Sequence, residues 1–184
     1  MARYCPHCGR ATVRKFDGGR EREACPEGHW VQYAETAIGV GALVLRGDRV
    51  LLVERGIPPV GRWTLPSGWI EQDETLGEAV VRELREETGL EGQPLGIICL
   101  RNIPKPGRNE FYVCFLCEVS PDAQPVPDGD ESTQARFVHP TEFDALDLSP
   151  FSRFVVERYL AQRPQPWPLS RDCPLPNAAV FAPF

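Results

Sequence analysis

The sequence predicts an α/β domain preceded by a small module that a metal ion holds together. Apolar runs of strand length lie on both sides of one strongly patterned helix, which is typical of an α/β fold. The first 33 residues carry cysteines at metal-ligand spacing. With 184 residues, 42% hydrophobic and 25% charged, the chain has the length for one domain plus a small module and the composition for a folded core.

Charge and cysteine usage limit the classes of partner. A formal net charge of −6 gives no basic footprint for a nucleic-acid backbone, so we expect no nucleic-acid partner. The first residues hold no apolar run, and the longest apolar stretch, 37–45, is far shorter than the roughly 20 residues of a membrane span. Seven cysteines in such a chain indicate metal ligands and buried thiols rather than disulfides. We therefore expect a cytoplasmic protein without a membrane partner.

Residues 1–33 resemble a zinc ribbon. Cys5 and Cys8 form a Cys-x2-Cys knuckle, and sixteen residues later Cys25 and His29 form Cys-x3-His, a plausible tetrahedral zinc set. Four protein ligands leave no open position for water, so the predicted zinc is structural. Most ribbons supply a second Cys-x2-Cys, so the alternative is that His29 is a surface residue and the zinc is lost. The segment 17–19, Asp-Gly-Gly, suits a hairpin turn between two short strands.

The next elements are two strands and a helix. Residues 36–46 and 49–54 predict strands joined by Gly47-Asp48, and their long apolar runs indicate a sheet buried on both faces. The loop that follows, up to residue 63, is too rich in proline and glycine for a helix or strand. From residue 76 the sequence predicts a helix, with Leu76, Val80 and Leu84 as its apolar row and Gly89 as its C-cap.

The end of this helix carries three carboxylates, Glu83, Glu86 and Glu87. At positions i, i+3 and i+4 they share one side of the helix, where like charges repel by roughly 0.2–0.5 kcal/mol per pair. A hard divalent cation such as Mg²⁺ or Mn²⁺ would neutralise them. The alternative is an ordinary solvated helix face.

The remainder of the chain alternates strands and loops. We expect strands at 95–102, 111–119 and 135–139, a helix at 152–162 starting near Ser152, and loops at 103–110 and 121–130. Lys105 and Arg108 in the first loop would either reach phosphates or face solvent. Three cysteines within the strands are interpreted as buried thiols: Cys99, Cys114 and Cys117. Residues 164–184 are crowded with proline and predict an extended tail that packs on the body or on a partner subunit.

The segment from Gly68 to Leu90 resembles the Nudix box at every defining position, namely Gly68, Glu74 and the run Arg82-Glu83-Leu84-x-Glu86-Glu87-x-Gly89-Leu90. The resemblance implies an α/β/α sandwich around a mixed sheet, over residues 36–163. It also implies metal-dependent hydrolysis of a nucleoside diphosphate linked to another group. A Nudix domain behind a zinc ribbon is itself a known arrangement.

The resemblance assigns roles to individual residues. Glu83, Glu86 and Glu87 would bind Mg²⁺ or Mn²⁺, with the carbonyl of Ser67 contributing beside Gly68. Arg82 and Glu74 would brace the carboxylates. The general base in this family is a glutamate of the box or one from a later loop. Here the loop candidate is Glu131, which is alternatively a further metal ligand or a solvated acid. Arg55 would bind a phosphate or pair with a box glutamate.

Substrate choice is indicated more weakly. A proline about fifteen residues beyond the box recurs in members that cleave ADP-ribose, and Pro104 stands there. The run Gln165-Pro166-Trp167-Pro168 resembles a motif of NADH pyrophosphatases but lies too far from the box. We expect ADP-ribose or a related dinucleotide (NADH, FAD), with a nucleoside triphosphate as the alternative. A non-catalytic nucleotide sensor is the second alternative, which the complete set of box glutamates disfavours. A homodimer is possible, as in many relatives.

Overall fold

The computed structural model describes residues 3–33, 35–105, 108–170 and 179–182. The chain forms two compact units, Met1–Thr36 with Lys105–Asn109, and Ala37–Pro104 with Glu110–Phe184. In the first unit, β1 (Val13–Asp17) and β2 (Arg20–Ala24) form an antiparallel hairpin. Its turn has Gly18 and Gly19 at positive φ, 57° and 80°, which confirms the predicted hairpin.

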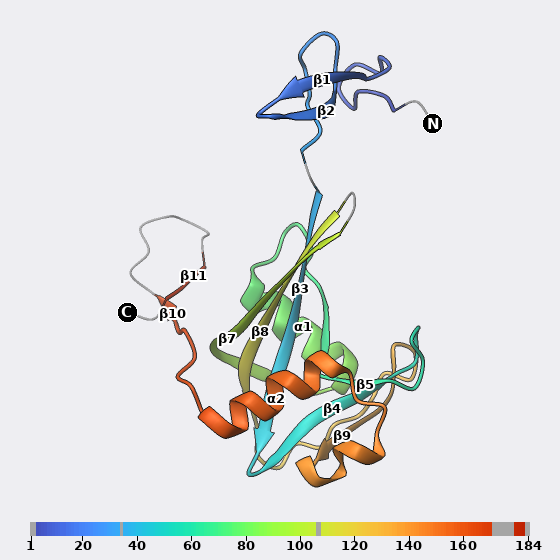
Figure 1. The fold of residues 1–184 in the computed structure, drawn as a ribbon. Coiled ribbons are helices and arrows are strands. Elements are labelled where there is room, and N and C mark those ends of the chain that lie inside the picture. The colour runs from blue at the N-terminus through green and yellow to red at the C-terminus, as the bar shows by residue number, and fades with distance from the viewer. Residues whose placement is uncertain (1–2, 34, 106–107, 171–178, 183–184) are drawn as a thin grey trace. The chain divides into compact units, whose positions relative to one another are not determined.

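The second unit is built on a seven-stranded sheet. Its strands are β3 (Glu35–Arg46), β4 (Arg49–Arg55), β5 (Trp63–Thr64), β6 (Ser67–Trp69), β7 (Gly92–Lys105), β8 (Arg108–Val119) and β9 (Ser132–Val138). The strand order is β5-β4-β3-β8-β7, with β6 paired to β3 and β9 paired to β4. The neighbours β3 and β8 run in the same direction (Figure 1), whereas β3 and β4 are antiparallel, so the sheet is mixed as expected.

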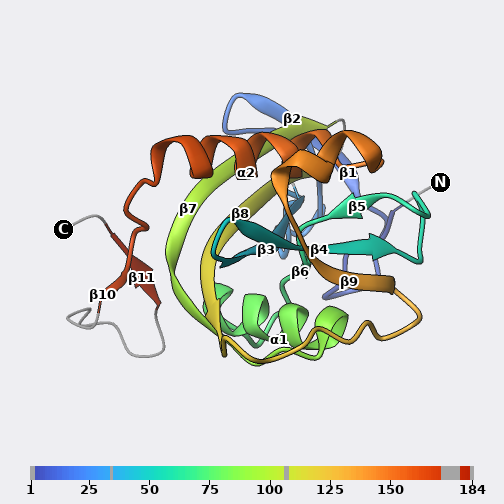
Figure 2. The same cartoon turned by 90° about the horizontal axis from the view of Figure 1, so that it is seen from below.

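One helix covers each face of the sheet (Figure 2): α1 (Leu76–Thr88) on one side and α2 (Pro150–Gln162) on the other. Successive residues of β3 serve opposite cores, because side chains alternate along a strand. Val40, Ala42 and Val44 join the core under α1, and Leu43 joins the core under α2. Burial of both faces is thus confirmed. Within the described residues, neither helix is long enough to cross a membrane.

Local sequence signals set the ends of α1. The Thr75 hydroxyl accepts from the Glu78 N–H, and the Glu78 carboxylate accepts from the Thr75 N–H, which forms a capping box. At the other end Gly89 adopts φ 67° and donates to the Arg85 carbonyl, as predicted for a glycine C-cap. Val80 and Leu84 of the predicted apolar row are fully buried in the core.

The prediction of a loop at 103–110 is wrong. β7 extends to Lys105 and β8 begins at Arg108, so most of that segment continues the two strands. β7 is the outer strand of the sheet path, where a proline such as Pro104 is tolerated because no inner ladder bond is lost.

Smaller departures have local causes. α2 begins at Pro150 with Ser149 as its N-cap, slightly before the predicted start at Ser152. The short strands β5 and β6 and the 3-10 helix Pro140–Ala145 were not predicted, because two to six residues are too few to show a hydrophobic period. Cys114 and Cys117 are buried as predicted, whereas Cys99 is only half-buried.

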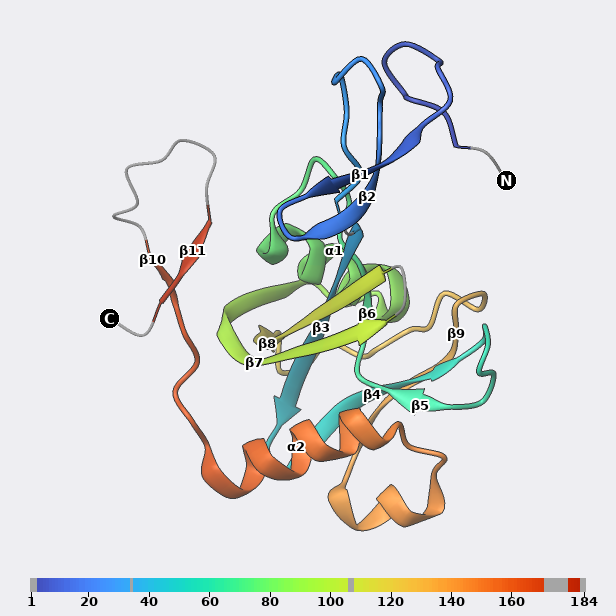
Figure 3. The ribbon, with the colours of Figure 1, turned by 45° about the horizontal axis from the view of Figure 1, so that its top comes forward.

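The described part of the tail packs on the body of the second unit. Trp167 exchanges two backbone hydrogen bonds with Ile97 of β7, at 2.8 and 3.0 Å. The small strands β10 (Leu169–Ser170) and β11 (Val180–Phe181) then pair with each other (Figure 3). The Phe181 ring lies edge-on to the core ring of Phe115, 5.1 Å between centroids. Of the two outcomes expected for the tail, packing on the body is therefore observed here.

Candidate active site and metal centre

The predicted carboxylates of α1 gather at one cavity. Glu83 and Glu87 are 8% and 4% exposed, while Glu86 faces solvent. These three glutamates and three acids of the loop before β9 (Asp128, Asp130 and Glu131) line a cavity of about 340 Å³. The fold therefore brings Glu131 to the helix carboxylates, although more than forty residues separate them in the sequence.

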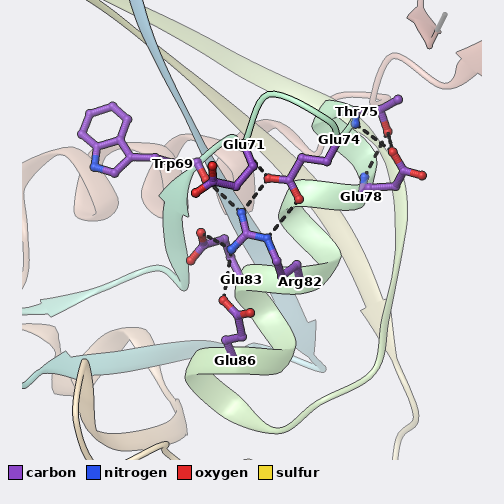
Figure 4. Close-up of polar contacts among 8 residues, drawn as sticks. All are labelled: Trp69, Glu71, Glu74, Thr75, Glu78, Arg82, Glu83 and Glu86. Carbon is purple, nitrogen blue, oxygen red and sulfur yellow. Dashed lines mark hydrogen bonds and ion pairs between the residues drawn. The ribbon is translucent and has the colours of Figure 1, made fainter. Parts of the chain in front are cut away.

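Arg82 is the hub that holds the carboxylates in place (Figure 4). It donates two hydrogen bonds to Glu74, at 2.6 and 3.0 Å, one to Glu83 at 2.7 Å and one to Glu86 at 3.0 Å. Its Nη2 also donates to the Trp69 carbonyl at 2.9 Å. The hydrogen bonds from Arg82 hold the pKa of Glu74 below its usual value. A guanidinium with five donors in a fixed plane suits this fork between carboxylates.

Residues of the short strand β6 contact the carboxylates of Glu83 and Glu87. A Cβ atom on Gly68 would lie 2.1 Å from an oxygen of the Glu83 carboxylate, so only glycine lets this carboxylate lie against the backbone. The neighbouring Ser67 N–H donates to Glu87 Oε2 at 2.7 Å, which fixes the Glu87 side chain. Both residues are held by pairing with β3, where Val40 is opposite Gly68 and Gly41 is opposite Ser67.

Burial and mutual repulsion perturb the two inner carboxyls. Burial raises the pKa of Glu87 to about 8, with the charge of Glu83 adding to the rise and the Ser67 N–H and Arg55 opposing it. Burial also raises the pKa of Glu83, against the effect of Arg82. Two buried carboxylates with too little positive charge around them are a good site for a cation. The oxygen-only donor set fits a hard divalent ion such as Mg²⁺ or Mn²⁺.

The loop that carries Glu131 is tightly fixed. Gly56 at the end of β4 donates to the Glu131 carbonyl at 2.8 Å. A Cβ on Gly56 would lie 2.1 Å from the Asp130 carbonyl oxygen, so the two backbones approach as closely as glycine allows. Asp128 accepts from the N–H groups of Asp130 and Ser132, both at 2.9 Å. No role was predicted for Asp128 from the sequence, although Asp128-Gly129-Asp130 is typical of a turn that an aspartate side chain fixes.

Arg55 and Pro104, both predicted to bind substrate, differ in their relation to the acidic cavity. Arg55 donates to the Pro58 carbonyl at 2.9 Å and lowers the pKa of Glu87 by its charge, and its buried Nε has no hydrogen-bond partner among the described residues. Pro104 is exposed near the end of β7 and is not among the residues that line the acidic cavity. The structure thus links Arg55 to the carboxylates through its charge, while Pro104 lies outside the lining of the cavity.

The four predicted zinc ligands of the first unit lie together. The ligand atoms of Cys5, Cys8, Cys25 and His29 are all within 4.8 Å of one another. Cys8 Sγ lies 3.6 Å from Cys25 Sγ, and Cys25 Sγ lies 3.8 Å from His29 Nδ1. Tetrahedral bonds of about 2.0–2.3 Å to zinc would place ligand atoms at about these separations. His7, between the two cysteines of the knuckle, faces solvent.

Comparison with known proteins adds independent information. A family model described as NUDIX domain matches residues 35–159. The chain is 32% identical over 167 residues to the NAD-capped RNA hydrolase NudC of Pseudomonas aeruginosa. The aligned segment covers 88% of this chain and 56% of NudC. It is 31% identical over 108 residues to the ADP-ribose pyrophosphatase of Methanocaldococcus jannaschii, covering 57% of this chain and 63% of that protein. The chain thus spans a little over half the length of the NudC relatives it matches.

Solved structures agree with this match. The crystal structure of a NUDIX hydrolase from Nitrosomonas europaea superposes with a TM-score of 0.75 at 27% identity, over 89% of this chain and 94% of that one. The superposed part, 89% of this chain, is larger than the segment 35–159 that the family model matches. The structural similarity therefore extends well beyond the helix that carries the carboxylates.

Proposed function

The chain belongs to the NUDIX domain family, and on that premise we propose that it hydrolyses the pyrophosphate bond of a nucleoside diphosphate derivative with a divalent metal ion. One observation carries the proposal: Glu83, Glu86 and Glu87 share a cavity with Glu131, while Arg82 holds two of the helix carboxylates in position. A nucleotide-binding module without activity would not need all of these groups in one cavity.

The chemistry follows from the charges. The negative oxygens of a pyrophosphate repel nucleophiles, and bound Mg²⁺ or Mn²⁺ would neutralise those oxygens and acidify water. Glu83, Glu86 and Glu87 would hold the ion, with the Ser67 carbonyl contributing. Arg82 and Glu74 keep the carboxylates from turning away, and the Ser67 N–H bond fixes the Glu87 side chain.

We assign roles in the reaction to two further residues. Glu131 faces the same cavity and takes the proton of the attacking water, or adds a metal ligand, with a box glutamate as the alternative base. Arg55 would bind a phosphate oxygen, a role supported by the effect of its charge on Glu87 and by its Nε, which has no hydrogen-bond partner in the described part of the chain. Pro104 remains a proposal from sequence alone.

We propose ADP-ribose or a related dinucleotide such as NADH or FAD as the substrate. The names of the relatives support this choice, since ADP-ribose and the NAD cap both contain a pyrophosphate between two nucleoside or sugar groups. The NudC name also weakens the expectation that nucleic acid is no partner, so NAD-capped RNA belongs among the candidates. Structural zinc in the first unit, a cytoplasmic location and a homodimer stay predictions.

The test is a substrate panel with and without Mg²⁺ or Mn²⁺. The panel contains ADP-ribose, NADH, FAD, a nucleoside triphosphate and NAD-capped RNA. We expect AMP and ribose 5-phosphate from ADP-ribose, and we expect Glu87→Gln to abolish turnover. The matched control is Glu91→Gln, which removes an exposed carboxylate just beyond α1 and should keep activity. Metal-independent turnover, or an unaffected Glu87→Gln variant, would contradict the proposed function; binding without any turnover would favour a nucleotide sensor.

A further inference from the structure

The carboxyl-terminal turn of α1 is completed by the loop that carries Glu131. The last carbonyls of any helix lack partners within the helix and must find donors elsewhere. Here the Thr88 carbonyl accepts from the Val126 N–H at 2.7 Å, and the Glu87 carbonyl accepts from the Ser132 hydroxyl at 2.7 Å. Residues 126–132 therefore cap the helix that bears the proposed metal ligands.

Ser132 is the buried link in this cap. It is fully buried, and its hydroxyl has one proton, which the short bond to Glu87 uses. The hydroxyl oxygen accepts from the Asp128 N–H at 3.3 Å. One side chain thus joins the backbone of a proposed metal ligand to the start of the loop.

Asp128 fixes the part of the loop that bears Glu131. A single oxygen, Oδ1, accepts from the N–H of Asp130 and from the N–H of Ser132, the residues immediately before and after Glu131. The Glu131 carbonyl is held in turn by the Gly56 N–H at 2.8 Å. The backbone at Glu131 is therefore held on both sides, with its side chain on the acidic cavity.

We propose that Asp128 and Ser132 are positioning residues, which set the place of Glu131 against the last turn of α1. This inference rests on the proposed function, because it assumes that Glu131 acts on the attacking water or on the metal. Asp128 acts through Glu131: its Oδ1 is occupied by the loop's own donors. The rigid cap makes the distance between Glu131 and Glu87 a property of the fold.

The kinetic test compares Asp128→Ala with Asp128→Asn. A misplacement of about 1 Å in a catalytic group can cost on the order of 100-fold, so we expect Asp128→Ala to lower kcat by roughly 10–100-fold, with KM nearly unchanged. Asparagine keeps an oxygen that accepts the same N–H groups, so Asp128→Asn should retain most of kcat. Asp122→Ala is the matched control, since Asp122 is an exposed acid of the same connecting segment outside the cavity.

A double-mutant cycle separates positioning from general destabilisation. If Asp128 acts only through Glu131, adding Asp128→Ala to Glu131→Gln should lower kcat by less than about 3-fold more. Ser132→Ala combined with Glu131→Gln should also lower kcat by less than about 3-fold more. This variant replaces Asp128→Ala in the cycle if Asp128→Ala folds poorly. The proposal would be overturned if the fall in kcat of the double variant equalled the product of the two single-variant falls. A wild-type kcat in Asp128→Ala would also overturn it. So would an unchanged kcat in Glu131→Gln when Glu87→Gln is inactive.

A measurement that needs no turnover keeps this test separate from the proposed function. Amide hydrogen exchange by NMR should show protected N–H groups at Asp130 and Ser132 in the wild type. Protection should be lost in Asp128→Ala and kept in Asp128→Asn. If no substrate on the panel is cleaved, the proposed function fails, but loss of protection in Asp128→Ala still supports the positioning role of Asp128. Unchanged protection in Asp128→Ala would refute that positioning role.

Discussion

Replacing Gly68 by alanine is a direct test of the site geometry. The added Cβ would lie 2.1 Å from a Glu83 carboxylate oxygen, whereas ordinary van der Waals contact begins at 3.4 Å. The carboxylate must therefore retreat by about 1.3 Å, which is the difference between these two distances. It is not free to do so without loss, because it is buried and accepts a 2.7 Å hydrogen bond from Arg82.

The expected loss falls on activity more than on stability. A shift of about 1 Å in a proposed metal ligand should lower kcat/KM on the order of 100-fold, or about 2.7 kcal/mol of transition-state stabilisation. The moving atoms are the end of a flexible side chain, so the cost to the free energy of unfolding should stay near 1 kcal/mol. The assay is ADP-ribose hydrolysis at several Mn²⁺ concentrations, combined with urea unfolding of the same variant.

The matched control is Gly77→Ala in the first turn of α1. There the nearest atom to an added Cβ outside the adjacent residues is 3.8 Å away, so the methyl group fits. Alanine is the better helix former by up to about 1 kcal/mol, so this variant should be slightly more stable and fully active. Equal activity in the Gly68→Ala and Gly77→Ala variants would refute the reasoning, as would a Gly68→Ala variant that simply unfolds.

Two further predictions concern pH and zinc. Because the pKa of Glu87 rises from 4.5 to about 8 on folding, its protonation stabilises the metal-free protein at low pH, and this contribution is lost as the pH rises from about 5 to 8. Without added Mg²⁺ or Mn²⁺, the free energy of unfolding of Glu87→Gln should therefore exceed that of wild type at pH 9, on the order of a few kcal/mol. At pH 5 the two free energies should be nearly equal. Urea unfolding that gives the same difference between the two proteins at both pH values would contradict this. The purified protein should hold about one equivalent of zinc, which Cys5→Ser should lose and the exposed control His7→Ala should keep, as measured by metal analysis; a zinc-free wild type would disprove the zinc site.

The sequence by itself determined the features that depend on neighbours within a few turns of chain. The row of Leu76, Val80 and Leu84 predicted α1, because every fourth residue returns to the same side of a helix. Gly89 predicted the end of α1 for an equally local reason. The acidic cluster at Glu83, Glu86 and Glu87 was also visible, since its members are one helical turn apart.

Local reasoning failed where pairing between distant strands decided the outcome. The segment 103–110 was predicted to be a loop because its prolines and glycine are turn residues, yet β7 continues to Lys105 and β8 begins at Arg108. The small strand β6 gave no periodic signal, although its pairing with β3 places Ser67 and Gly68 under the carboxylates. No property of residues 67–68 alone predicts that Ser67 will donate to Glu87.

Only the tertiary structure shows which acids of the 121–131 loop line the same cavity as the carboxylates of α1. From the sequence, Glu131 was the loop candidate for the general base, and Asp128 had no assigned role. Pairing of β9 with β4 brings this loop to Gly56 and to the end of α1, where the carbonyls of Glu87 and Thr88 need donors. The carboxylates of α1 were therefore readable from the sequence, because helical spacing is local. Their partners were not, because long-range strand pairing and the unmet hydrogen bonds of a helix end bring them into place.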